Sequence, residues 1–159
     1  MIRPFRTEDA ADVAALTLAA IRTIGARAYS AAQVDAWAGR HPGPERFLAR
    51  AAKGDRILVA VDAQDMPVAY VLTEADGHVD MLYCHPDHAG RGLGARLLGR
   101  AELAAQTSGL TRLFTEASEL ARPVFARAGY TLLHRRDFTL PGERGDVAIH
   151  NYAMEKRLA

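Results

Sequence analysis

A glycine-rich turn joins a strand-like segment directly to a long helical segment in the middle of the chain. Glycines stand at positions 90, 92 and 94, between the apolar run 79–84 and the helical pattern 95–106. Alternating glycines let the backbone adopt angles that other residues avoid, and they leave free N–H groups at the start of the helix. The helix dipole makes that end favourable for a negative group. The turn therefore predicts a binding site for a phosphate ester.

Two common phosphate-binding motifs do not match this turn. The dinucleotide motif Gly-x-Gly-x-x-Gly needs a third glycine where Leu97 stands. The nucleoside triphosphate loop needs a lysine and then a serine or threonine after its last glycine, but Ala95 and Arg96 follow Gly94. These mismatches argue against a Rossmann dehydrogenase and against a kinase or ATPase. A purely structural turn remains the alternative, and the flanking Arg91 and Arg96 favour the anion site.

The composition indicates one globular domain spanning residues 1–159. Of the 159 residues, 49% are hydrophobic and 25% are charged, the formal net charge is +1, and Cys84 is the single cysteine. A net charge this small creates no general attraction for nucleic acid or an anionic membrane surface. No apolar run approaches the ~20 residues of a membrane span. We therefore expect a cytoplasmic protein that binds neither nucleic acid nor a membrane.

Hydrophobic periodicity and turn residues predict the order strand, helices, antiparallel meander, helix, strand, helix and strand pair. Helices are expected over 10–24, 29–39, 44–53, 95–106 and 120–127, and strands over 1–6, 56–62, 68–74, 79–84, 110–115, 130–140 and 147–157. Short connections between the central strands favour hairpins. This order predicts an α/β (α+β) fold with a mostly antiparallel mixed sheet and helices on both faces.

The central segment resembles the acyl-coenzyme A signature of the GNAT superfamily of N-acetyltransferases. In the signature x-Pro-x-x-Gln/Arg-x-x-Gly-x-Gly/Ala, the matching residues are Pro86, Gly92 and Gly94. Arg91 stands where a basic residue is common, and Ala89 replaces the usual Gln or Arg. Further similarity lies in segments 2–10, 121–130 and 149–156, the last of which resembles a bacterial subgroup of small acetyltransferases. The resemblance implies a single-domain GNAT-like fold with splayed central strands and acetyl-coenzyme A as co-substrate.

The resemblance also implies how this chain would hold acetyl-coenzyme A. The pyrophosphate would lie on the amides of the turn, and the pantetheine arm would pair like an extra strand. A backbone N–H near Cys84 would polarise the acetyl carbonyl. No metal is expected, because His85 and His88 lack a third ligand at fixed spacing. The cofactor-binding residues implied are Leu82, Tyr83, Cys84, Ala89, Gly90, Arg91, Gly92, Leu93, Gly94, Ala95, Ser118 and Phe125.

Acetyl transfer requires a neutral amine and a route for its proton. His78, Asp80, Leu82 and Cys84 alternate along the strand, which predicts that they share one face. His78 matches a family position where a general base often stands, and an ordinary pKa near ~6.5 suits that task. Asp80 could orient His78, bind the amine as a cation, or act through water. A solvated turn position for His78 is the open alternative.

The usual proton donor of the family is missing here. The resemblance places Phe125 where a tyrosine commonly protonates the departing thiolate, and Ser118 where an asparagine commonly contacts the cofactor arm. Tyr83, Tyr152, Cys84 and water remain as donors, or the thiolate leaves without acid help. A covalent role for Cys84 lacks a clear Cys-His-Asp arrangement, so a small, half-buried strand residue is expected.

The acceptor is expected to be a small-molecule amine or a protein amino group that attacks directly in a ternary complex. Tyr29, Trp37 and Glu116 are the candidate substrate-binding residues, while Arg135 and Arg136 are expected on an exposed face. The sequence leaves the oligomeric state open, with a homodimer as one option. The alternative function is a non-catalytic acyl-coenzyme A binding module on the same fold, which Phe125 makes conceivable.

Overall fold

The computed structural model describes all 159 residues and contains every helix and strand expected above. The strands are β1 (Ile2–Pro4), β2 (Arg56–Val61), β3 (Pro67–Thr73), β4 (Val79–Cys84), β5 (Arg112–Ala117), β6 (Thr131–Leu140) and β7 (Val147–Arg157). The helices are α1 (Ala10–Thr23), α2 (Ala31–Ala38), α3 (Glu45–Lys53), α4 (Leu93–Thr107) and α5 (Arg122–Arg127), with short 3-10 helices at Thr7–Asp9, Gly25–Arg27 and Pro86–His88. None of the helices combines the length and the apolar character needed to cross a membrane.

The helix expected over 29–39, with Ser30 as its opening residue, is α2, and the structure confirms Ser30 in that role. Ser30 has extended backbone angles, and its side chain accepts a hydrogen bond from the Gln33 N–H at 3.2 Å. The Gln33 side chain in turn accepts from the Ser30 N–H at 2.9 Å. This reciprocal capping box makes Ser30 the N-cap, so the helix begins at Ala31.

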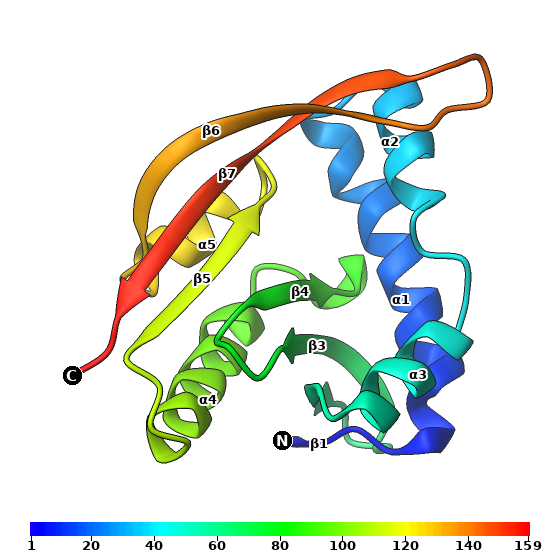
Figure 1. Ribbon diagram of the computed structural model, residues 1–159. Helices are drawn as coiled ribbons and strands as arrows, with labels where there is room; N and C mark the ends of the chain where they lie inside the picture. Colours follow the sequence, from blue (N-terminus) through cyan, green and yellow to red (C-terminus); the bar gives the residue numbers. More distant parts are fainter.

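The strands form two antiparallel sheets that separate between β4 and β5. The first sheet has the order β1-β2-β3-β4 and the second has the order β5-β7-β6. One parallel bridge, between His78 and Phe114, joins the two sheets. In Figure 1, β4 and β5 diverge, and β6 and β7 extend past β5 toward α2. The predicted mixed, mostly antiparallel sheet with splayed central strands is confirmed.

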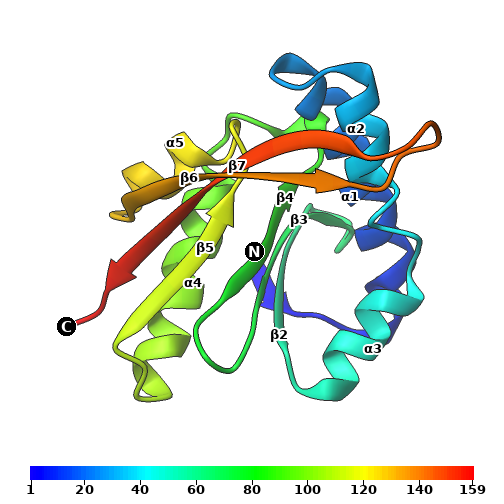
Figure 2. The same ribbon diagram turned by 45° about the horizontal axis from the view of Figure 1, so that its top comes forward.

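Helices cover both faces of the first sheet (Figure 2). Tyr70 and Leu72 of β3 belong to a core cluster with residues of α1 and α3, whereas Val71 belongs to a cluster with α4. This alternation follows from the period of two in a strand. The long apolar runs of β2 and β3 are buried because both faces are covered. The expected arrangement of helices on both faces is confirmed.

A third core cluster joins the far ends of β6 and β7 to α2. It contains Val34 of α2 together with Leu140 and Ile149, which flank the β6–β7 turn. The second sheet therefore reaches across the opening between β4 and β5. This places β6 and β7 on one wall of that opening and α2 on the other.

A β-bulge at Asp80 changes the faces of β4. The register of β4 on β3 pairs Val79 and Met81 with adjacent β3 residues and skips Asp80. An extra residue interrupts the alternation of side chains. Val79 consequently packs in the α4 cluster, together with Leu82 and Cys84. The prediction that His78, Asp80, Leu82 and Cys84 share one face is therefore wrong.

Candidate active site

The glycine-rich turn presents a row of unpaired amides at the N-terminus of α4. Gly90 and Gly92 have φ angles of 77° and 76°, in the left-handed region that favours glycine. No N–H from Gly90 to Ala95 donates to an acceptor in the protein, and the first bond at this end runs from Arg96 N–H to the Gly92 carbonyl at 3.1 Å. Free amides at a helix N-terminus form a site for an anion.

A cavity of about 330 Å³, called here the turn cavity, lies beside this turn. Arg27, Arg127 and His88 line it, and no carboxylate does, so its charge suits a polyanionic ligand. Ten of the predicted cofactor residues also line it, whereas Arg91 and Phe125 do not. The ten are Leu82, Tyr83, Cys84, Ala89, Gly90, Gly92, Leu93, Gly94, Ala95 and Ser118.

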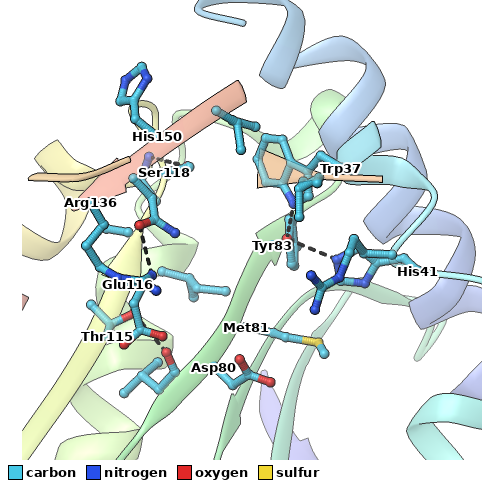
Figure 3. A pocket seen from close by; sticks show the side chains of 18 of the residues that line it. Trp37, His41, Asp80, Met81, Tyr83, Thr115, Glu116, Ser118, Arg136 and His150 are labelled. Atoms are coloured by element: carbon cyan, nitrogen blue, oxygen red, sulfur yellow. Dashed lines mark hydrogen bonds between the residues drawn. The ribbon is translucent and has the colours of Figure 1, made fainter. Parts of the chain in front are cut away.

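A second cavity of about 370 Å³, called here the gap cavity, lies between the diverging parts of β4 and β5. Figure 3 shows Glu116, Ser118 and Arg136 on one side of it, with Trp37, Tyr83 and His41 on the other. Tyr29, Asp80 and Phe125 also line this cavity. The two cavities meet at the end of β4, because they share the lining residues Trp37, Leu82, Tyr83, Ser118 and Ala121.

The edge of β4 that faces β5 has unpaired amides where the cavities meet. β4 pairs only with β3, and just beyond its end the His85 N–H donates to the Val68 carbonyl at 2.8 Å. Because N–H groups along a strand alternate between its two edges, those of Leu82 and Cys84 point away from β3 and toward the gap. This edge is available to an extended ligand.

His78 is held at the bridge between the two sheets. Its Nδ1 lies 2.6 Å from Glu74 Oε1 and its Nε2 lies 2.8 Å from Glu116 Oε1, while its ring stacks on Phe114 with 4.9 Å between centroids. The hydrogen bonds to Glu116 and Glu74 outweigh burial and raise the pKa of His78 to about 9. At neutral pH the ring is therefore protonated, and it lies outside the lining of both cavities. This arrangement offers no lone pair to a substrate.

Glu74, His78 and Asp80 bring potential metal-ligating atoms within 4.8 Å of one another. The Arg50 guanidinium already donates to Asp80 Oδ2 at 2.7 Å and lies 3.8 Å from Glu74 Oε1. Both ring nitrogens of His78 are also engaged. We therefore assign the cluster to ion pairing that ties α3 to the start of β4.

The Tyr83 hydroxyl lies in a buried hydrogen-bond chain at the wall of the gap cavity. The Trp37 indole N–H donates to it at 3.1 Å, and His41 Nε2 lies 3.4 Å from the same oxygen. Burial raises the pKa of Tyr83, while burial and the nearby Arg46 lower the pKa of His41 to about 4. Tyr83 is therefore a neutral hydroxyl, and His41 is a neutral ring with a buried, unpartnered Nδ1.

Three other predicted residues, Tyr29, Phe125 and Cys84, are held by hydrogen bonds or by burial. The Tyr29 hydroxyl donates to the His150 carbonyl at 2.9 Å and accepts from the Glu119 N–H at 2.8 Å, so it also connects β7 to the loop after β5. Phe125 is 2% exposed and brings no polar atom to the gap cavity. Burial raises the pKa of the Cys84 thiol, which disfavours the reactive thiolate.

The sequence reasoning missed several polar residues of the gap cavity. Arg136 was expected on an exposed face, but it is half-buried and lines the cavity. The other missed polar residues are Arg40, Arg46, Thr115, His150 and Asn151. Arg136, His150 and Asn151 reach the site because β6 and β7 extend past β5, whereas Arg40 and Arg46 come from the segment after α2 and from the start of α3. No local sequence pattern reports either arrangement.

A splayed antiparallel sheet with a turn of free amides at its opening is an arrangement suited to an acyl-coenzyme A ligand. The family described as "Acetyltransferase (GNAT) domain" matches residues 25–154, and the chain belongs to this family. The resemblance seen in the central motif is thereby confirmed.

Known relatives agree with this assignment. A Rhodopseudomonas palustris protein, described as a GCN5-related N-acetyltransferase and as an aminotransferase of class II, is 35% identical, with a TM-score of 0.88 over 99% of this chain and 95% of that chain. The uncharacterised N-acetyltransferase YafP of Escherichia coli K12 is 29% identical over 129 residues, which are 81% of this chain and 79% of that protein. Neither cavity is lined by a lysine, the residue with which aminotransferases hold pyridoxal phosphate.

The same fold occurs in two proteins solved with coenzyme A ligands. The PaiA N-acetyltransferase of Thermoplasma acidophilum, in complex with coenzyme A, has a TM-score of 0.78 and 16% identity over 99% of this chain and 98% of that chain. A phosphinothricin acetyltransferase of Sinorhizobium meliloti, in complex with acetyl-coenzyme A, has a TM-score of 0.77 and 16% identity over 100% of this chain and 88% of that chain.

Proposed function

We propose that this protein transfers an acetyl group from acetyl-coenzyme A to a primary amine by direct attack in a ternary complex. The observation that carries the proposal is the meeting of the two cavities at the end of β4. The turn cavity combines free amides with basic side chains, as a phosphate ligand requires. The gap cavity contains Asp80 and Glu116, whose carboxylates can receive an ammonium group.

The residues of the turn cavity fit acetyl-coenzyme A. The amides of residues 90–95 would hold the pyrophosphate. The open edge of β4 at Leu82 and Cys84 would pair with the two amides of the pantetheine arm, and Ser118 contributes a hydroxyl beside it. The cofactor supplies the acetyl group as a thioester. A β4 amide pointing into the gap would stabilise the developing oxyanion, where loss of one donor costs ~3 kcal/mol.

The gap cavity provides side chains for the two proton transfers. The amine lone pair forms the C–N bond, the C–S bond breaks, the nitrogen loses a proton and the sulfur gains one. Asp80, oriented by Arg50, would bind the ammonium form and accept its proton through water. Tyr83 lines both cavities and would donate a proton to the thiolate in place of the missing tyrosine at position 125.

Steady-state turnover of acetyl-coenzyme A with a panel of amines tests the proposal, with thiol release and product mass as readouts. Tyr83→Phe should lower kcat by about 10²-fold or more if its hydroxyl is the donor. Tyr130→Phe is the matched control, because the Tyr130 hydroxyl is buried without a partner and lies outside both cavities. Binding of the cofactor without thiol release for any amine would instead support the non-catalytic binding module.

A further inference from the structure

Three arginines from separate parts of the chain line the gap cavity. Arg40 follows α2, Arg46 lies in the first turn of α3, and Arg136 lies in β6. Arg46 and Arg136 are half-buried, whereas Arg40 is exposed. Arg136 stands on the β5 side of the cavity, across from His41, which lies just beyond α2 (Figure 3). Two half-buried cations therefore belong to different walls of the same small space.

None of these arginines has a carboxylate partner in the protein. Arg46 donates to the backbone carbonyl of Arg40. Arg136 donates to Asn151 Oδ1 at 3.1 Å, and its guanidinium lies 5.4 Å from the ring centroid of Phe138. A half-buried charge without a counter-ion destabilises the folded state. The positions of Arg46 and Arg136 are therefore better explained by a ligand than by stability.

The carboxylates of the same cavity already have partners. Asp80 is bonded to Arg50 at 2.7 Å, and Glu116 is bonded to the protonated His78 at 2.8 Å. The cavity wall therefore carries uncompensated positive charge, together with carboxylate oxygens that can still accept hydrogen bonds. A molecule with an ammonium group and a separate anionic group complements both features.

We propose that the acetyl acceptor is such a molecule, a primary amine that also bears a carboxylate or phosphonate, as in an amino acid. Arg46 and Arg136 bind the anionic group, and the amine lies near Asp80 at the end of β4. Guanidinium groups suit this role because they hold carboxylates and phosphonates with charge-assisted, often bidentate hydrogen bonds. The inference rests on the proposed acetyl transfer and adds the substrate class to it.

The test compares matched pairs of acceptors, each protein amino acid against its α-carboxamide, with an aminoalkylphosphonate as a second anion. Thiol release from acetyl-coenzyme A gives kcat/KM, expressed per concentration of free amine because the paired amines differ in basicity. The wild-type protein should prefer at least one acid over its carboxamide by about tenfold or more. In the double variant Arg46→Gln, Arg136→Gln this ratio should fall toward one. Arg144→Gln, in the exposed turn between β6 and β7 and outside both cavities, should keep the wild-type ratio.

The outcomes separate this inference from the function on which it rests. Equal kcat/KM for every acid and its carboxamide, or a preference that the double variant retains, overturns the inference and leaves acetyl transfer intact. Failure of every amine to release thiol, with coenzyme A still bound, overturns the proposed function and the inference together.

Discussion

His78→Gln should remove a pH-dependent contribution to stability without removing a catalytic base. In the folded protein the pKa of His78 is raised from its ordinary 6.5 to about 9, first by Glu116 and then by Glu74. A raised pKa means that the folded state binds the proton more tightly than the unfolded state. The contribution is therefore fully present below pH 6.5 and is lost as the pH rises through about 9.

The magnitude follows from the pKa and from the exposure of the three side chains. At 1.36 kcal/mol per pKa unit, the rise corresponds to at most about 3 kcal/mol. The side chains are 17% exposed for His78, 28% for Glu74 and 31% for Glu116, so solvent screens the pair interactions. We therefore expect about 1–2 kcal/mol near pH 6.5, or a fall in Tm of about 2–4 °C per kcal/mol.

Urea unfolding at intervals from pH 6 to pH 10 measures this contribution. The difference between wild-type and His78→Gln should shrink across the interval from pH 6.5 to about 9. His134→Gln is the matched control, because that histidine is exposed on β6 and should keep the wild-type pH dependence. A constant difference at all pH values would refute the assignment of the raised pKa. Loss of a kcat/KM limb at an apparent pKa of about 6–7.5 in His78→Gln would show instead that His78 is the base.

Three further predictions concern the turn and the thioester site. Gly92→Val and Gly94→Val should abolish the stabilisation by acetyl-coenzyme A, which is ~2.7 kcal/mol at 100 times its Kd. Gly99→Ala is the control and should keep this stabilisation, because an added Cβ there meets nothing within 4 Å. An unchanged thermal shift in both valine variants would place the phosphate site elsewhere. Phe125→Leu should keep kcat within about tenfold and Phe125→Tyr should gain a modest factor, since the ring supplies no proton; a loss above about 10²-fold in folded Phe125→Leu would contradict this. Mass spectrometry after incubation with acetyl-coenzyme A alone should find no acetyl adduct on Cys84, because burial raises its thiol pKa; an adduct that Cys84→Ala removes would refute direct transfer.

Features that depend on a short stretch of the chain were predictable from the sequence. The amide-rich turn depends on Gly90 and Gly92, whose positive φ angles only glycine adopts readily. The helices and strands follow from periodicity and capping, as the Ser30 cap at the start of α2 illustrates. The absence of a hydroxyl at Phe125 is likewise a property of the residue itself. Such features need only local backbone geometry or the chemistry of one side chain.

The tertiary structure alone decided which polar groups line the gap cavity. Strict alternation placed His78 beside Leu82 and Cys84, but the bulge at Asp80 arises from pairing with β3 and puts His78 between two carboxylates at the sheet junction. Arg46 and Arg136 are 90 positions apart in the chain and reach one cavity only because β6 crosses the gap toward α2. Long-range strand pairing and packing set these positions, and a local pattern of residues carries no record of them.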